Sequence, residues 1–409
     1  MNERRNGRRG LRRLIRVLLA VLFLVGGYVG YAAIRHSRPV ALPEPGGRYP
    51  VGRIITDWTD RTRADPLAPQ PAAVRRLSVW IWYPASSAAT GGRAPYAPGR
   101  WSDLHLPGIV GLGETRFDAV RVHSVDRAPV APGRFPVVVL EPGLGFAAAQ
   151  YSAIAENLAS DGYLVLGVTP TYSANLTVLD GQVVRASEAG IPSAFDGEDL
   201  HAGAAQQAGD RLVGVWSADA RFAAAQAANL DRSGLLSGHV DAGRVAYVGH
   251  SFGGASALQA CHDDPHCFAA ADLDGTQYGP VVHDGLDRPM LTMASEDACV
   301  TGTCRPAIAG DRSDQAVARS LLAAGTGPAW AYQVTGMRHF NFTDYDAYYL
   351  AEPLRRLLAL GSVPRGRGLT ITNAYLAAFL DHAVRHADEP LLTAATGAFP
   401  EVRLQSTGS

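Results

Sequence analysis

A short glycine-rich segment carries the residue types that nucleophilic catalysis requires. Residues 249–254 read Gly-His-Ser-Phe-Gly-Gly, so Ser251 has a glycine two positions before it and another two positions after it. A serine held in a sharp turn between a strand and a helix has a strained backbone, and only very small residues fit at these two positions. Gly249 and Gly253 meet that requirement, and the backbone N–H of Phe252 would then point at a developing oxyanion.

The flanking residues give this pattern its weight. A chain with 44 glycines produces Gly-x-Ser-x-Gly by chance, and the alternative interpretation is a glycine-rich turn with a surface serine. Here an apolar strand is predicted at residues 244–248 and a helix at residues 252–261. A strand, a tight turn and a helix form the context of a nucleophile elbow, which favours a catalytic serine.

A serine nucleophile also needs a base and an acid. In the α/β-hydrolase order, the acid and then the histidine follow the serine along the chain. His339 comes just after the last predicted strand, where a loop can bring its imidazole to Ser251. Asp274 and Asp297 each follow a predicted strand, and both remain candidates for the acid that orients the histidine and stabilises the imidazolium.

Strands and helices alternate around these residues. The predicted strands are residues 77–84, 135–140, 163–168, 244–248, 268–273, 290–294 and 330–334. The predicted helices are residues 148–160, 201–230, 252–261, 312–324 and 369–386. Short uninterrupted apolar runs suit strands that are buried on both faces, so we predict a mostly parallel sheet with helices on both sides. Residues 169–199 are predicted to be rich in loops and to form a pocket wall.

The N-terminal residues differ in charge from the rest of the chain. The first sixteen carry seven arginines (positions 4, 5, 8, 9, 12, 13 and 16), and residues 17–34 are uncharged and apolar. At about 1.5 Å per residue, this apolar run spans roughly 27 Å as a helix, close to a hydrocarbon core of ~30 Å. Arginines favour the cytoplasmic side, so we predict an anchor that exports everything after residue 35. The alternative is a cleaved signal, with small residues near Gly30 to Ala33 at the cleavage site.

The predicted organisation has four parts. Residues 1–16 form an arginine-rich cytoplasmic segment, residues 17–34 form the anchor or signal helix, residues 35–76 form a linker and irregular lead-in, and residues 77–409 form the catalytic domain. Hydrophobic residues make up 47% of the 409, which is enough for a large core. The net charge of -1 gives no field that would gather nucleic acid. The oligomeric state is left open.

Four cysteines occur as two close pairs. Export makes disulfides chemically available, and each local pair closes a short loop. We therefore predict the disulfides Cys261–Cys267 and Cys299–Cys304. The cysteine and histidine spacing does not favour a zinc site, and we expect neither a metal nor a cofactor.

Several short segments, taken in order, resemble the plasma-type (isoform II) platelet-activating factor acetylhydrolases and their bacterial relatives. The resemblance extends from about Pro50 to Tyr345. Its matching segments are residues 49–52, 82–84, 143–145, 151–154, 249–254 and 273–274, together with His339 and Asn341-Phe342. The elbow and the His-x-Asn-Phe segment are the most specific of these.

The resemblance implies an α/β-hydrolase fold and a role for each site residue. Ser251 would be the nucleophile, Asp274 the acid and His339 the base, with the backbone N–H groups of Leu144 and Phe252 as oxyanion donors. The implied reaction is hydrolysis of short acyl esters through an acyl-serine intermediate. The implied substrates include the sn-2 acyl group of platelet-activating-factor-like or oxidised phospholipids.

One position departs from the family pattern, and two other functions stay open. Glu141 precedes the Gly-Leu-Gly loop, and we expect its carboxylate to turn away from the oxyanion or to pair with an arginine. A secreted carboxylesterase or polyester/cutin hydrolase would place its acid after the later strand, at Asp297. A membrane-anchored binding protein on a hydrolase scaffold is the non-enzyme alternative, and the intact serine, aspartate and histidine set argues against it.

Overall fold

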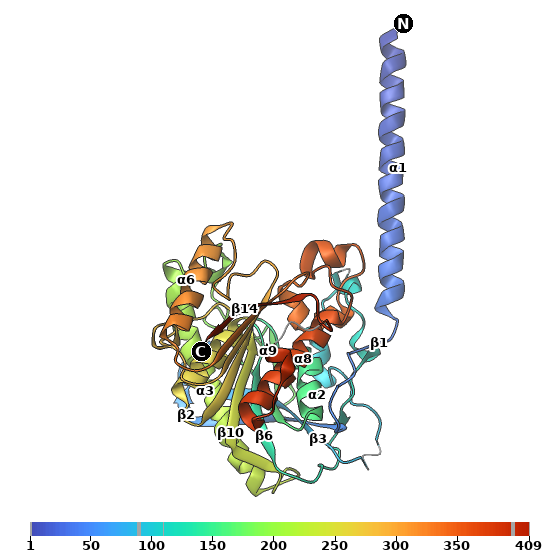
Figure 1. The fold of residues 1–409 in the computed structure, drawn as a ribbon. Coiled ribbons are helices and arrows are strands. Elements are labelled where there is room, and N and C mark those ends of the chain that lie inside the picture. The colour runs from blue at the N-terminus through green and yellow to red at the C-terminus, as the bar shows by residue number, and fades with distance from the viewer. Residues whose placement is uncertain (1, 88–90, 109, 394–396, 409) are drawn as a thin grey trace.

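A 10-stranded sheet forms the centre of the molecule, and one long helix projects from its side (Figure 1). The structure is a computed structural model and describes residues 2–87, 91–108, 110–393 and 397–408. The side chains of residues 2–10 and 406–408 lie outside the described part, which removes four of the seven N-terminal arginines from the structural account.

The central strands of the sheet run parallel. Across the sheet the order is β14-β13-β12-β11-β10-β6-β7-β3-β2-β5. Pairing is parallel from β13 through to β7, and antiparallel at β14 and in the β7–β3–β2 ribbon. The strands are β2 (Val51–Ala64), β3 (Val74–Pro84), β5 (Val125–Asp126), β6 (Phe135–Glu141), β7 (Leu164–Thr169), β10 (Val240–His250), β11 (Cys267–Leu273), β12 (Met290–Ser295), β13 (Ala329–Val334) and β14 (Val402–Gly408). The predicted α/β fold with a mostly parallel sheet is confirmed.

Helices cover both faces of this sheet. Side chains alternate along β6, so Val138 and Leu140 pack into one apolar cluster while Val137 and Val139 pack into another. The first cluster includes α2 and α8, and the second includes α3 and α4. The helices are α2 (Ser152–Ser160), α3 (Ala204–Arg232), α4 (Phe252–Asp263), α5 (Val281–Asp284), α6 (Ala309–Ala324), α7 (Tyr345–Tyr348), α8 (Arg367–Arg385) and α9 (Pro390–Thr393).

The expected irregular lead-in at residues 35–76 is corrected by the structure. Strand β2 has 14 residues and pairs antiparallel with β3 along most of its length. Charged residues interrupt the apolar pattern of β2, and one of them, Arg53, is buried. Arg53 is fully buried, donates to Asp126 and stacks on Trp80. Its guanidinium therefore has both a carboxylate partner and an aromatic one within this outer part of the sheet. The catalytic body therefore begins well before residue 77.

Three further pairings involve strands that were not expected from the sequence. β8 (Leu176–Leu179) and β9 (Gln182–Arg185) form a hairpin within the predicted loop region 169–199. β1 (Val40–Ala41) pairs with β4 (Val120–Arg121) beside the base of the long helix. β14 adds an antiparallel edge to β13, although its sequence has few apolar residues. Pairing partners distant in sequence, rather than local apolar runs, define β1 and β14.

The predicted N-terminal span is one continuous helix, α1 (Asn2–His36). Within the described residues it is long and apolar enough to cross a membrane from Leu11 to His36. A membrane anchor and a signal sequence share these properties. Both predicted disulfides are present, Cys261–Cys267 and Cys299–Cys304, and disulfides are typical of proteins outside the cytoplasm.

Candidate active site

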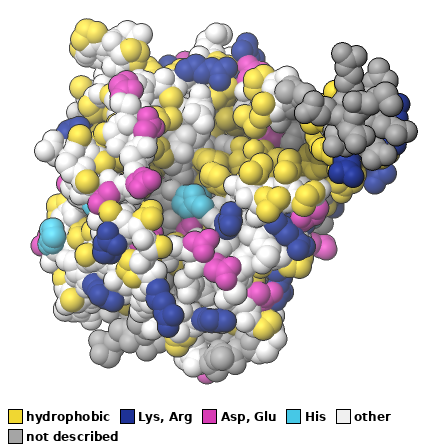
Figure 2. Space-filling view, turned by 90° about the horizontal axis from the view of Figure 1, so that it is seen from above, with side chains coloured by type: hydrophobic (Ala, Val, Ile, Leu, Met, Phe, Trp, Pro, Cys, Tyr) yellow, Lys and Arg dark blue, Asp and Glu magenta, His cyan; other side chains and the backbone are white. Residues whose placement is uncertain are grey.

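A cavity of about 700 Å³ opens at the carboxyl ends of the central strands. This edge of a parallel sheet is where α/β enzymes bind their ligands. Seen from the side to which α1 projects, the surface is hollowed, and a histidine lies in the hollow (Figure 2). The cavity wall includes Ser251, Asp274 and His339 together with the aromatic residues Phe195, Phe252 and Tyr278.

Ser251 lies in the sharp turn between β10 and α4. Its backbone has φ 57° and ψ -127°, a conformation that L-residues rarely adopt. A side chain on Gly249 would bring its Cβ to 2.0 Å from Gly253 O, and one on Gly253 would approach Pro142 O to 2.3 Å. Both glycines are therefore required for the turn, as the spacing in the sequence predicts.

The side chain of His339 lies between Ser251 and Asp274. Its Nε2 is 2.9 Å from Ser251 Oγ, and its Nδ1 is 2.8 Å from Asp274 Oδ2. With the proton on Nδ1, the imidazole donates to the carboxylate and accepts the hydroxyl proton of the serine. The His339 side chain is 41% exposed, whereas that of Asp274 is only 2% exposed. The imidazole thus faces the cavity, and the carboxylate that orients it is shielded from water.

Asp274 is held by a second contact that fixes its orientation. It follows β11 with φ 62°, and the backbone N–H of Ser295 donates to its Oδ1 over 2.6 Å. Both carboxylate oxygens thus have donors. Asp297 is placed differently: its side chain is 77% exposed and lies 3.9 Å from the Arg338 guanidinium. The structure brings Asp274 to His339, and it does not support Asp297 as the alternative acid, because the turn after β12 directs that carboxylate to the cavity rim.

Two backbone N–H groups border the position where an oxyanion would form. Phe252 is the first residue of α4, and the first N–H groups of a helix have no partner within it. On the opposite loop, the backbone N–H groups on both sides of Leu144 already have acceptors. Gly143 N–H donates to Tyr151 Oη, and Gly145 N–H donates to Ser173 O. This arrangement agrees with the predicted donor pair Leu144 and Phe252.

A buried bridge joins the three loops of the site, and the sequence analysis missed it. Gly143 N–H donates to Tyr151 Oη, and Tyr151 Oη lies 2.8 Å from His250 Nδ1. His250 Nε2 in turn lies 3.0 Å from the backbone oxygen of His339. Burial and the nearby His339 hold the pKa of His250 well below its usual range, so the ring is neutral. A single tautomer satisfies the bridge, with Tyr151 donating to Nδ1 and Nε2–H donating to His339.

No role for His250 was predicted from the sequence. A residue just before the nucleophile points away from the cavity, and here it points into the core behind the histidine loop. Tyr151 carried no signal beyond its place in a matching segment and on the apolar side of a helix. Its hydroxyl acquires a function only when α2, β10 and the histidine loop are packed together.

Glu141 is buried behind the oxyanion loop and does not line the cavity. The carboxyl is thus turned away, as expected, but no arginine that the structure describes forms an ion pair with it. Burial raises its pKa well above the usual range, and the nearby Ser256 hydroxyl opposes that shift only in part. The raised pKa favours the protonated, uncharged carboxyl, which places no negative charge beside an oxyanion.

Comparisons with known proteins agree with this geometry. Residues 40–186 match the family model for platelet-activating factor acetylhydrolase, isoform II. The chain is 23% identical over 398 residues to a protein of Arthroderma benhamiae named "Probable 1-alkyl-2-acetylglycerophosphocholine esterase", covering 88% of this chain and 92% of the relative. It is 27% identical over 174 residues to a platelet-activating factor acetylhydrolase of Cavia porcellus, covering 39% and 40% of the two chains.

A solved structure is similar over almost the whole chain. The ferulic acid esterase of Streptomyces cinnamoneus superposes with a TM-score of 0.71 at 29% identity, and the match covers 90% of this chain and 99% of that one. The family match, the named esterase relative and this esterase structure agree on one kind of reaction. The chain is a carboxylic ester hydrolase with an α/β-hydrolase fold, and it resembles the isoform II platelet-activating factor acetylhydrolases.

Proposed function

We propose that this chain hydrolyses short-chain acyl esters through an acyl-Ser251 intermediate. The observation that carries the proposal is the hydrogen-bonded series Ser251–His339–Asp274 on the wall of the cavity. Each member has the partner that its role needs: a hydroxyl beside a base, and a base oriented by a shielded carboxylate.

The chemistry follows from these positions. Ser251 Oγ attacks the ester carbonyl carbon while its proton passes to His339 Nε2, and Asp274 stabilises the imidazolium. The N–H groups of Leu144 and Phe252 donate to the oxyanion. When the tetrahedral intermediate collapses, the alcohol leaves with the proton from His339. A water molecule then gives a proton to His339 and attacks the acyl carbon, which releases the acid and restores Ser251.

The proposed substrate class is the sn-2 short acyl group of platelet-activating-factor-like or oxidised phospholipids. Support comes from the two relatives whose names refer to that ester and from the family match. We further propose that α1 is retained as an anchor, which would keep the site outside the cytoplasm and close to lipid. Tyr28 and Arg35 of α1 both donate to carbonyls of the catalytic body, which a cleaved signal would have no reason to do.

An aryl ester is the second candidate substrate, for a specific reason. The cavity wall carries four aromatic rings, Phe195, Phe252, Tyr278 and Phe340, and the similar solved structure is a ferulic acid esterase. A planar aromatic acyl group would pack against such a wall.

Two assays test these proposals. Fluorophosphonate labelling should modify the wild type and not Ser251→Ala; labelling that persists in the variant would refute Ser251 as the nucleophile. For the substrate, we would compare p-nitrophenyl esters from C2 to C12, a 2-acetyl phospholipid and methyl ferulate. A preference for short acyl chains with phospholipid turnover supports the first candidate, and preference for the ferulate supports the second.

A further inference from the structure

The C-terminal turns of α1 are fixed to the catalytic body. Tyr28 Oη donates to Ala351 O over 3.2 Å, and Arg35 Nη1 donates to Leu350 O over 2.6 Å. The carbonyl of His36 accepts from the backbone N–H of Arg116 over 2.8 Å. These contacts are spread over about two helical turns, so the direction of α1 relative to the cavity is set by the fold.

The segment that receives α1 also forms one edge of the cavity. We call residues 349–361 the lip; its short helix, Arg355–Ala359, places Leu358 and Ala359 in the cavity wall. Leu350 and Ala351, the acceptors of α1, belong to the same lip. The anchor helix and the mouth of the cavity are therefore joined through one short piece of chain.

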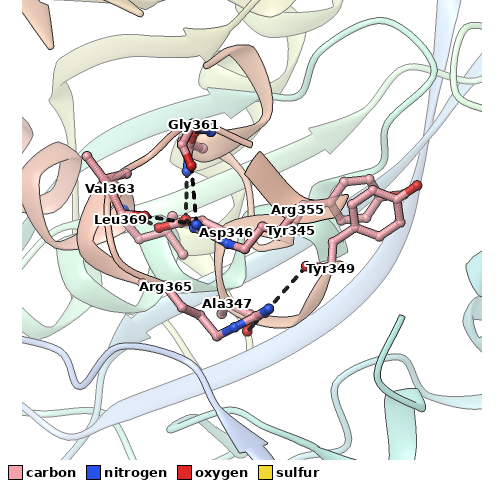
Figure 3. A network of polar contacts seen from close by, with 12 residues as sticks. Tyr345, Asp346, Ala347, Tyr349, Arg355, Gly361, Val363, Arg365 and Leu369 are labelled. Atoms are coloured by element: carbon pink, nitrogen blue, oxygen red, sulfur yellow. Dashed lines mark hydrogen bonds and ion pairs between the residues drawn. The ribbon is translucent and has the colours of Figure 1, made fainter. Parts of the chain in front are cut away.

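Two arginines hold the lip in place (Figure 3). Arg355 donates to Asp346 over 2.5 Å and to the carbonyl of Val363 over 2.8 Å, and the ion pair is buried. Arg365 donates to Ala347 O and to Leu350 O. Leu350 O also accepts a hydrogen bond from Arg35 of α1. A buried ion pair with further hydrogen bonds to backbone carbonyls holds the lip in a defined position on the surface.

Large apolar side chains are exposed at this edge. Leu357 is 66% exposed and Leu358 is 67% exposed, while Val110, on the short helix that packs against α1, is 60% exposed. Figure 2 shows hydrophobic side chains in a band between the hollow and the end-on α1. Apolar surface gathered in one place marks a site of contact with a partner or a membrane.

The depth at which α1 would cross a membrane indicates whether a partner protein or a membrane covers this apolar surface. The apolar run 17–34 is about 27 Å long as a helix, and crossing a hydrocarbon core of ~30 Å requires all of it. Tyr28 lies at the level of Ala351, because the two are hydrogen-bonded. The helical rise of six positions from Tyr28 to Ile34 therefore places roughly 9 Å of the apolar span alongside the lip rather than above it.

We propose that the bilayer spanned by α1 covers the lip and Val110, so that the cavity mouth opens directly onto the outer leaflet. An ester lipid would then pass from the leaflet to Ser251 without crossing bulk water. The inference rests on the proposed ester hydrolysis and on retention of α1. The occupant is a lipid surface, since the exposed leucines lie beside a membrane span and at the depth of its outer end.

A paired activity measurement tests the proposal with the full-length chain in phosphatidylcholine vesicles. One substrate is a 2-acetyl phospholipid in the vesicle, and the other is p-nitrophenyl acetate in water. The test variant is Leu357→Ser with Val110→Ser, neither of which lines the cavity. The control is Leu235→Ser. Leu235 is also exposed, and it precedes β10, at the amino ends of the parallel strands and away from the cavity.

The test variant should lose roughly tenfold in kcat/KM on the vesicle-borne ester, because two apolar side chains no longer anchor the mouth. Its turnover of the soluble ester should stay within about twofold, as expected for surface substitutions. Equal turnover of the vesicle-borne ester by the test variant and Leu235→Ser would overturn the proposal. Failure of the wild type on both esters would instead refute the proposed hydrolysis.

A second measurement does not depend on catalysis or on tolerance of the double substitution. Leu357→Trp in the full chain should show fluorescence that brominated phosphatidylcholine quenches in excess of the wild type. Leu235→Trp should show no excess quenching. If position 357 behaved like position 235, the lip would lie in water and the proposal would be wrong, whatever the enzyme hydrolyses.

Discussion

The inner wall of the cavity and its rim are built on different principles. Asp274 lies on the inner wall, and His250 and Tyr151 pack behind it. All three are buried, and each makes hydrogen bonds that fix its orientation. At the rim, Asp297, Leu357 and Leu358 are exposed, and Asp297 reaches an arginine only at 3.9 Å. Positions that must hold a reacting geometry within a fraction of an ångström are over-determined, whereas positions that meet substrate are free to vary.

This difference separates the reaction from the choice of ester. A buried group with one set of partners cannot change without a large cost, so we expect the inner wall to determine the reaction. The rim presents exposed side chains to an arriving substrate, and the lip presents exposed apolar side chains beside α1. Substitutions on the inner wall should therefore change kcat steeply, and those at the rim should change which ester is preferred.

The sharpest test of the inner wall is removal of the nucleophile. Ser251→Ala should lower kcat on p-nitrophenyl acetate by about 10⁶-fold, since the remaining residues cannot form an acyl-enzyme. The measurement is steady-state turnover with matched far-UV circular dichroism. Retention of more than a thousandth of wild-type activity would mean that the reaction does not pass through Ser251.

The two aspartates compare the inner wall with the rim directly. Asp274→Asn should lower kcat by about 10⁴-fold, because the amide no longer stabilises the imidazolium and favours the wrong tautomer of His339. Asp297→Asn is the matched substitution at the rim, and its effect on kcat should be less than about tenfold. Kinetics on one soluble ester are sufficient. The opposite ranking would transfer the role of the acid to Asp297.

The bridge behind the histidine should show a smaller effect. Tyr151→Phe leaves Gly143 N–H and His250 Nδ1 without a partner, at a cost of about 1–3 kcal/mol for each buried group. Because the bridge positions the oxyanion loop and the His339 turn, we expect kcat to fall about 10–100-fold with little change in KM.

Tyr163→Phe is the control for this bridge. The hydroxyl of Tyr163 also makes a hydrogen bond, to Asp381. Tyr163 directly precedes β7, at the end of that strand away from the cavity. The Tyr163→Phe substitution should lower the stability of the protein without lowering kcat. Comparable losses of kcat in both variants would show that Tyr151 has only a structural role.

The smallest expected effect concerns Glu141, which is buried behind the oxyanion loop. Burial raises the pKa of Glu141 above its unfolded value, so its contribution to stability is complete below about pH 4.3 and is lost as the pH rises towards the folded pKa. In that window each pH unit costs about 1.4 kcal/mol. Glu141→Gln, which stays neutral, should therefore lose less Tm than the wild type between pH 5 and pH 9.

Thermal unfolding followed across this pH range is the measurement for Glu141. Activity should change little in Glu141→Gln, because the raised pKa of Glu141 favours the uncharged carboxyl, which the neutral glutamine matches. A parallel fall of Tm in the wild type and in Glu141→Gln would mean that the carboxyl is ionised in the folded protein.

Much of this protein was predictable from local sequence. The elbow at Ser251 needs only neighbouring glycines and a flanking strand and helix, and the apolar run 17–34 needs only its length and lack of charge. The parallel core strands were predicted because side chains buried on both faces give uninterrupted apolar runs. The roles of Ser251, His339 and the oxyanion donors remain predictions, which the geometry supports.

Tertiary structure decided what depends on partners distant in sequence. Strand β2 was missed because its buried Arg53 is neutralised by Asp126, 73 residues away, and periodicity does not register such a pair. From the residues alone Asp274 and Asp297 were equivalent, since each follows a strand; only the packing of the histidine loop showed which carboxylate reaches the imidazole. The direction of α1 relative to the cavity is also a tertiary property, because it depends on contacts with residues more than 300 positions further along the chain.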